Sequence, residues 1–111
     1  MRVIHFLNQF FGGIGAEEHA NMAPEVREGP IGPGRLLENA LKGEGGEVVA
    51  TIICGDNYIV EEKDDALEIV REALDKYEPD VLVAGPAFDA GRYGLGCAYA
   101  CIAAQDRGIP A

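Results

Sequence analysis

The stretch VIHFLNQFFGGIGAEEHANMAPEVREGPIGPG (residues 3–34) joins a short, mostly apolar run to an unusually long connection. Residues 3–7 are rich in β-forming side chains, which predicts a buried strand. Connections in compact domains are usually about 4 to 6 residues long, and structureless ones beyond roughly 15 are typically functional or disordered. Disordered segments lack apolar anchors. We therefore interpret residues 8–34 as an ordered functional loop, anchored by Phe10, Phe11, Ile14, Met22, Val26 and Ile31.

Apolar runs and helical patterns alternate along the rest of the chain. Mostly apolar runs predict strands over residues 48–54 and 80–84. Apolar side chains at helical spacing predict helices over residues 34–42 and 61–77, and an alanine-rich helix that ends near residue 107. Gly43 and Gly108 are expected to end the first and last of these helices. Turns are expected over residues 43–46 and 55–58.

This βαβαβα order predicts one α/β domain over residues 1–111, with three layers in which helices cover both faces of a mostly parallel sheet. The order is Rossmann-like or flavodoxin-like. Residues 109–111 look like the approach to a further strand, so we expect the sheet to be incomplete at its C-terminal end and the chain to be the first portion of a longer protein.

The segments that follow the three predicted strands all leave from the carboxyl ends of those strands, which is the edge where open α/β sheets bind ligands. We therefore expect the long loop, the turn over residues 55–58 and the loop over residues 85–94 to lie close together.

The glycines of the long loop invite comparison with phosphate-binding loops, but the neighbouring charges oppose it. Neither GxGxxG nor GxxxxGK[ST] occurs, and Glu17 and Glu18, which follow the glycines, would repel a phosphate. Two interpretations stay open. The two carboxylates could bind a cation, helped by the aromatic faces of Phe6, Phe10 and Phe11. Alternatively, they open a short helix, where negative charge is favoured.

Arg92 lies at the start of the last predicted helix, on the same edge of the sheet. A guanidinium there could bind a carboxylate with two parallel hydrogen bonds. Combined with a cation site, it would suit a small zwitterion such as an amino acid. Alternatively, Arg92 pairs structurally with Asp89 or another loop acid. The candidate substrate contacts at this edge are Glu17, Glu18, Asp56, Tyr58, Asp89 and Arg92.

The formal charge of −10, with 19 acidic against 9 basic residues, opposes nucleic-acid binding. No apolar run approaches the roughly 18 residues of a membrane span, and the opening lacks the pattern of a signal peptide. We therefore expect a cytoplasmic protein that binds neither nucleic acid nor membrane.

The three cysteines do not predict a disulfide framework. Cys97 and Cys101 share a face of the last predicted helix, but Cβ atoms at that spacing are about 5 to 6 Å apart. A disulfide requires roughly 3.5 to 4.5 Å. We expect both thiols to be buried as small hydrophobic groups. Cys54, within an apolar strand, is a still weaker candidate nucleophile.

Three segments carry a family resemblance: residues 8–34, ICGDNY (residues 53–58) and GPAFDAGRYGLGC (residues 85–97). They resemble component B of the glycine/sarcosine/betaine reductase family, the substrate-binding selenoprotein subunits. The subunits of D-proline reductase are a more distant match. The resemblance extends from Met1 to Pro110, which is essentially the whole chain.

The resemblance implies a cytoplasmic, anaerobic system that cleaves the C–N bond of glycine, sarcosine or betaine reductively and releases ammonia or a methylated amine. The two-carbon unit would pass to the small selenoprotein A, and component C would release it as acetyl phosphate. Electrons would come from a thioredoxin-type system.

The selenocysteine of that family lies well beyond residue 111, and no cysteine of this chain matches its position. The resemblance therefore places no catalytic residue and no cofactor within this chain. We expect the N-terminal part of a substrate-binding subunit. The alternatives are a non-catalytic docking or assembly module that associates, or self-associates, through an open sheet edge, and a metal-binding domain that uses Glu17, Glu18 and His19.

Overall fold

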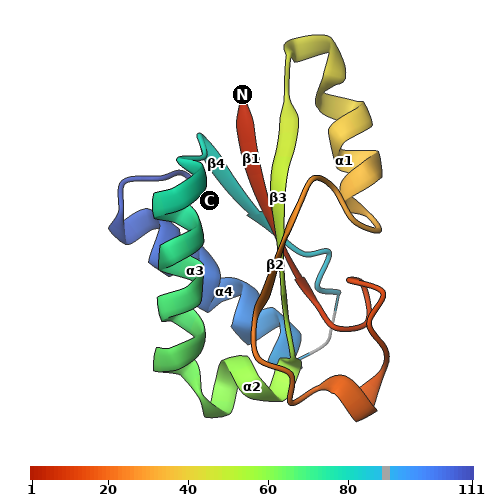
Figure 1. Ribbon diagram of the computed structural model, residues 1–111, viewed down its shortest axis with the longest axis vertical. Helices are drawn as coiled ribbons and strands as arrows, with labels where there is room; N and C mark the ends of the chain where they lie inside the picture. Colours follow the sequence, from red (N-terminus) through yellow and green to blue (C-terminus); the bar gives the residue numbers. More distant parts are fainter. Residues whose placement is uncertain (89–90) are drawn as a thin grey trace.

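The computed structural model describes residues 1–88 and 91–111 and contains a mixed sheet of four strands in the order β2-β3-β1-β4 (Figure 1). The central strand β1 is parallel to β3 and to β4, whereas β2 is antiparallel to β3. The predicted α/β class with a mostly parallel sheet is therefore confirmed. The strands are β1 (Arg2–Asn8), β2 (Glu25–Glu28), β3 (Glu47–Cys54) and β4 (Val81–Ala84).

The three parallel strands are arranged with the first between the second and the third, which is the order in which a flavodoxin-like sheet begins. Because crossovers between parallel strands are right-handed, a chain that moves first to one side of β1 and then back across it places its two crossovers on opposite faces. The helices are α1 (Gly34–Leu41), α2 (Asp56–Glu61), α3 (Lys63–Tyr77) and α4 (Gly91–Asp106), with short 3-10 helices η1 (Glu17–His19) and η2 (Lys42–Glu44).

Side chains of β1 alternate between two differently covered faces. Phe6 belongs to the main core beneath α3 and α4, whereas His5 shares a small cavity with Pro33 and Leu37 at helix α1. Helices α3 and α4 also lie on the same side of the sheet in Figure 1, away from α1. The three predicted layers are therefore present.

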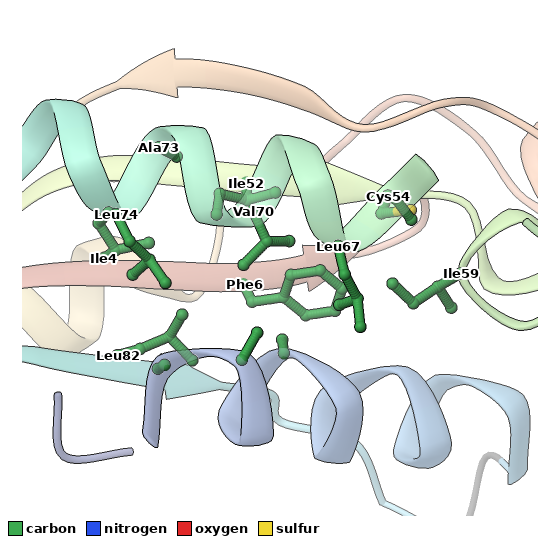
Figure 2. Packing of buried hydrophobic residues seen from close by; sticks show 14 of the residues in the cluster. Ile4, Phe6, Ile52, Cys54, Ile59, Leu67, Val70, Ala73, Leu74 and Leu82 are labelled. Carbon is green, nitrogen blue, oxygen red and sulfur yellow. The ribbon is translucent and has the colours of Figure 1, made fainter. Parts of the chain in front are cut away.

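The main core lies between the sheet and the pair α3 and α4 (Figure 2). Ile4, Phe6 and Leu82 are at most 1% exposed and point from the sheet toward these helices. Helix α4 contributes mainly alanines, whose small side chains allow it to approach the sheet closely. The largest members of the core are Ile4, Phe6, Ile52, Ile59, Leu67, Val70, Leu74, Leu82 and Tyr93.

The prediction of one loop over residues 8–34 is wrong in part, because this segment contains η1 and strand β2. Strand β2 pairs with β3 in a register that sets Val26 opposite Ile52. Its sequence, EVRE, has one apolar residue among three charged ones. It therefore lacks the repeated alternation of apolar and polar residues that predicts a half-buried strand. A short, charged strand at a sheet edge is also poorly suited to pairing with another chain.

The predicted turn over residues 55–58 is also wrong, because helix α2 begins at Asp56. The backbone N–H groups of Asn57 and Tyr58 donate to the carbonyl of Ala20 at 2.8 and 3.2 Å, respectively. The long loop thus satisfies donors at the first turn of α2, which a local sequence pattern cannot reveal. The predicted helix over residues 61–77 is present as α3, which begins at Lys63, whereas Glu61 ends α2.

The first predicted helix ends differently from the expectation. Helix α1 stops at Leu41 and the chain continues as η2 through Gly43, so Gly43 is not the stop signal. Gly45 takes that role, because it adopts the left-handed conformation at φ 73°. Gly108 follows the end of α4 with φ 75°, as expected.

Residues 109–111 run beside the outer edge of β4, where the backbone N–H of Leu82 donates to the carbonyl of Pro110 at 2.9 Å. They are not assigned to a strand.

Among the helices described within residues 1–88 and 91–111, none is long and apolar enough to cross a membrane.

Candidate functional site

Two neighbouring cavities lie at the carboxyl edge of the sheet. The first, which we call the aromatic cavity, has a volume of about 280 Å³ and is lined by Asn8, Gln9, Phe10, Phe11, Ala16, Glu17, Asp56, Ala87, Phe88 and Tyr93. The second, which we call the arginine cavity, has a volume of about 550 Å³ and is lined by Glu17, Asp56, Asn57, Gly91, Arg92 and Tyr93. The two cavities share three residues and are therefore adjacent.

The aromatic cavity lies at the point where the strand order reverses. Asn8 ends β1 and residues 9–11 follow it, whereas residues 87–88 follow β4, the neighbour of β1 on the side opposite β3. Open α/β sheets bind ligands in the crevice between the carboxyl ends of two such strands, because the following connections diverge to opposite faces. The expected meeting of the three loops at this edge is therefore confirmed for the described residues.

The turn after β1 is fixed by its own backbone and by Asn8. The side-chain oxygen of Asn8 accepts a hydrogen bond from the N–H of Phe11 at 2.9 Å, and its carbonyl accepts one from the N–H of Gly12 at 2.9 Å. Gly12 packs directly on Ile53, since a Cβ atom at Gly12 would lie 2.6 Å from Ile53 Cγ2. This close packing holds the neighbouring Phe10 and Phe11 over the end of the sheet.

Asp56 is held at the start of α2 by Asn8, the last residue of β1, and by Gln9, the residue after it. Its Oδ2 accepts hydrogen bonds from the side-chain amides of Asn8 at 3.2 Å and Gln9 at 3.3 Å. Its backbone N–H donates to the side-chain oxygen of Gln9 at 3.1 Å. Burial raises the pKa of the Asp56 carboxyl, and the two amide donors offset part of that rise. Asp56 is thus a fixed carboxylate that faces both cavities.

Aromatic rings form one wall of the site. The ring of Phe11 lies 5.8 Å from that of Tyr93 and 5.8 Å from that of Phe88, with interplanar angles near 30°. Phe10 meets Phe11 edge to face at 5.3 Å. Phe10 and Phe88 remain 62% and 79% exposed, respectively, although both are large and apolar. Aromatic faces beside carboxylates attract cations, so this wall suits an ammonium group.

Glu17 and Glu18 open the short helix η1, as the second interpretation of this pair predicted. Of these two residues, Glu17 lines both cavities and Glu18 lines neither. Glu18 Oε1 accepts a hydrogen bond from the backbone N–H of Ala16 at 3.1 Å, and this bond lowers the pKa of the Glu18 carboxyl. The carboxylates brought together at the cavities are therefore Glu17 and Asp56.

Arg92 lines the arginine cavity, but its guanidinium already has partners on α2. It donates a short hydrogen bond to the side-chain oxygen of Asn57 and a longer one to Glu61 at 3.5 Å. The side chain is 55% exposed, which leaves other N–H groups facing solvent. The predicted alternative partner, Asp89, lies outside the described residues.

Tyr58 lies on α2 and packs against the main core, and it is not among the residues that line either cavity. Burial raises the pKa of the Tyr58 hydroxyl, and the nearby carboxylates of Asp65 and Glu62 add to the rise.

The structure therefore brings together Glu17, Asp56 and Arg92 of the predicted set, and places Glu18 and Tyr58 beside them. Sequence reasoning missed Asn8 and Gln9, although polar residues directly after a strand are a usable signal.

Cysteine chemistry is disfavoured at this site. Cys54 and Cys97 are buried, and burial raises the pKa of each thiol to about 12. Cys101 is half-buried, and burial raises its pKa as well. In the part of the chain that the structure describes, no three His, Cys, Asp or Glu side chains are grouped so as to hold a metal ion. The metal-site interpretation of Glu17, Glu18 and His19 therefore gains no support.

These features define an open α/β domain with a candidate small-ligand site at the carboxyl ends of its parallel strands. The chain belongs to the glycine/sarcosine/betaine reductase selenoprotein B family, since the profile of that family matches residues 1–111. The resemblance read from the sequence motifs is therefore confirmed.

Curated relatives support the same assignment. The glycine reductase complex component B subunit gamma of Symbiobacterium thermophilum is 54% identical over 111 residues, which cover 99% of this chain and 26% of the relative. The sarcosine reductase complex component B subunit beta of Peptoclostridium acidaminophilum is 50% identical over 111 residues, which cover 99% of this chain and 25% of the relative. The betaine reductase complex component B subunit beta of the same organism is 42% identical over 106 residues, covering 96% and 24%, respectively.

The chain thus spans about a quarter of the length of the curated relatives that it matches. No solved structure matches it significantly.

Proposed function

We propose that this chain is the N-terminal part of the substrate-binding subunit of a glycine, sarcosine or betaine reductase, and that its two cavities contact the zwitterionic substrate. The observation that supports the proposal is the adjacency of the aromatic cavity and the arginine cavity at the reversal of strand order. Glu17 and Asp56 would attract the cationic nitrogen, and Arg92 would attract the carboxylate.

The reductive cleavage of the C–N bond would use the family's selenocysteine, which we expect outside this chain. Within this chain we propose binding and orientation of the substrate alone. Cys54, Cys97 and Cys101 are buried or half-buried with raised pKa values, and we assign them no catalytic role. The partners that follow from this proposal are selenoprotein A and component C, in the cytoplasm.

Calorimetric titration of glycine, sarcosine and betaine into purified component B that contains this chain tests the proposal. We expect saturable binding of at least one of them. Replacing Arg92 with alanine should weaken that binding about tenfold or more, because a charge-assisted contact to the carboxylate is worth roughly 1.5 to 3 kcal/mol. Glu17→Gln should weaken it by a smaller factor, because Asp56 remains as a second carboxylate at the same cavities.

Arg107→Ala is the matched control. Arg107 follows α4 at the end opposite Arg92 and pairs with Asp75, far from both cavities. This variant should bind like the unmodified protein. Equal losses in the Arg92 and Arg107 variants would contradict a substrate contact at Arg92.

The second candidate function is a non-catalytic docking module, favoured by the contrast between the two sheet edges. Strand β2 is short and charged, whereas β4 has the apolar sequence VLVA. Residues 109–111 occupy the backbone N–H of Leu82 at the outer edge of β4, so another chain or another copy would pair with the rest of this edge or take the place of residues 109–111. If a folded component B binds none of the three ligands, this candidate replaces the first.

A further inference from the structure

Unpartnered polar atoms concentrate at the aromatic cavity. Within residues 1–88 and 91–111, three buried side-chain polar atoms lack a hydrogen-bond partner: His5 Nδ1, Asp56 Oδ1 and the Tyr93 hydroxyl. The last two belong to residues that line both the aromatic and the arginine cavity. A buried polar atom without a partner costs about 1 to 3 kcal/mol. Because both residues line the same two cavities, a ligand bound there is a candidate for the missing partners.

We propose that Asp56 and Tyr93 select ligands whose ammonium group still carries N–H donors, and so discriminate against quaternary ammonium ligands. This inference rests on the proposed function, because it concerns the same cavities. It goes further because it names two residues that distinguish the possible substrates by whether their nitrogen carries N–H groups.

In this proposal, the carboxylate of Asp56 accepts a hydrogen bond from the ammonium group of the ligand. Its Oδ2 already receives both side-chain amides from the end of β1, which fixes the carboxylate plane. Its Oδ1 is left without a donor. An ionised carboxylate can only accept hydrogen bonds, so the partner that Oδ1 requires is an N–H or O–H group. A protonated primary, secondary or tertiary amine provides one together with a complementary charge.

Tyr93 cannot turn its hydroxyl to solvent instead. The residue is 2% exposed, and its ring stacks with Phe11 at 5.8 Å. The ring is therefore fixed by packing at the start of α4, with its hydroxyl beside the backbone of Asn8 at the wall of the cavity. A hydroxyl both donates and accepts, so it can accept from an ammonium N–H or donate to a ligand carboxylate.

The aromatic wall does not discriminate against a quaternary ammonium group. Ring faces attract such groups as well as ammonium groups that carry N–H donors. A hydrogen-bonding group discriminates more sharply, since a ligand that lacks the donor leaves the buried acceptor unpaired. A quaternary ammonium has no N–H group. Binding it would bury Asp56 Oδ1 against methyl groups.

A methylation series of ligands tests the proposal in component B that contains this chain. Glycine, sarcosine, N,N-dimethylglycine and betaine carry three, two, one and no N–H groups in their cationic forms. We expect the first three to bind with comparable affinity. Affinity should then fall roughly 10- to 100-fold from N,N-dimethylglycine to betaine, because the last charge-assisted donor is lost. Betaine that binds as tightly as N,N-dimethylglycine would overturn the proposal.

Two variants assign the effect to the named residues. Asp56→Asn removes the charge and weakens all four ligands, so the readout is the ratio of the affinities of N,N-dimethylglycine and betaine, which should approach one. Tyr93→Phe keeps the ring and should weaken the ligands that carry N–H groups several-fold more than betaine. Tyr99→Phe on the same helix, whose ring lies beside Lys63, is the control and should change nothing.

An unchanged ratio in both the Asp56 and Tyr93 variants would also overturn the proposal, even if the ligands bind. Absence of binding by all four ligands would instead overturn the proposed function, so the two failures are distinguishable.

Discussion

Replacing Gly55 with alanine is expected to destabilise the protein by about 2 to 4 kcal/mol, since the added methyl group overpacks a rigid contact and breaks helix-capping bonds. A Cβ atom there would lie 2.3 Å from the carbonyl oxygen of Ala20 and 2.7 Å from the backbone nitrogen of Met22. Neither group can move freely. Gly55 donates to the carbonyl of Met22, and the Ala20 carbonyl accepts from the first turn of α2. Urea unfolding followed by circular dichroism measures the loss.

Gly43→Ala is the matched control for that substitution. A Cβ atom at Gly43 meets nothing within 4 Å, and this variant should stay within about 0.5 kcal/mol of the unmodified protein, as exposed substitutions usually do. The Gly55 variant should also lose ligand binding, because Asp56 follows directly. If both variants unfold at the same urea concentration, the long loop does not hold α2 in the way described.

Truncating Phe6 to alanine is expected to cost about 3 to 5 kcal/mol, the range found when a buried phenylalanine is removed from a packed core. Phe6 is 1% exposed on the central strand and projects between the sheet and the pair α3 and α4 (Figure 2). It is also paired in the sheet with Ile52 on one side and Ala84 on the other. The same unfolding measurement gives the value.

Phe10→Ala provides the comparison for the same chemical change at a surface position. Its side chain is 62% exposed, so the cost in unfolding free energy should be below about 1 kcal/mol. Similar losses for the Phe6 and Phe10 variants would contradict the assignment of Phe6 to the core.

The parallel part of the sheet could be predicted because each of its strands is a mostly apolar run. Residues 48–54 and 80–84 are such runs, and burial on both faces of a parallel sheet requires that composition. Strand β2 could not be found in this way. Its one apolar side chain, Val26, lies between charged residues, and its pairing with β3 is fixed by the path of the long loop rather than by local preference.

The site was predictable in position but not in detail. The carboxyl edge follows from strand direction alone, and Glu17, Asp56 and Arg92 line one cavity at that edge. The roles of Asn8 and Gln9 depend on the distance from β1 to the start of α2, which no local pattern encodes. Glu18 lines neither cavity, and its carboxylate accepts a hydrogen bond from the backbone of its own turn.

The most direct test is a crystal structure of component B that contains this chain, grown with glycine. We predict glycine at the carboxyl edge of this sheet, with its ammonium group within hydrogen-bond distance of Asp56 and its carboxylate beside Arg92. Glycine bound at a site formed without these residues, with the aromatic and arginine cavities filled by another protein segment, would contradict a substrate-binding role for this chain.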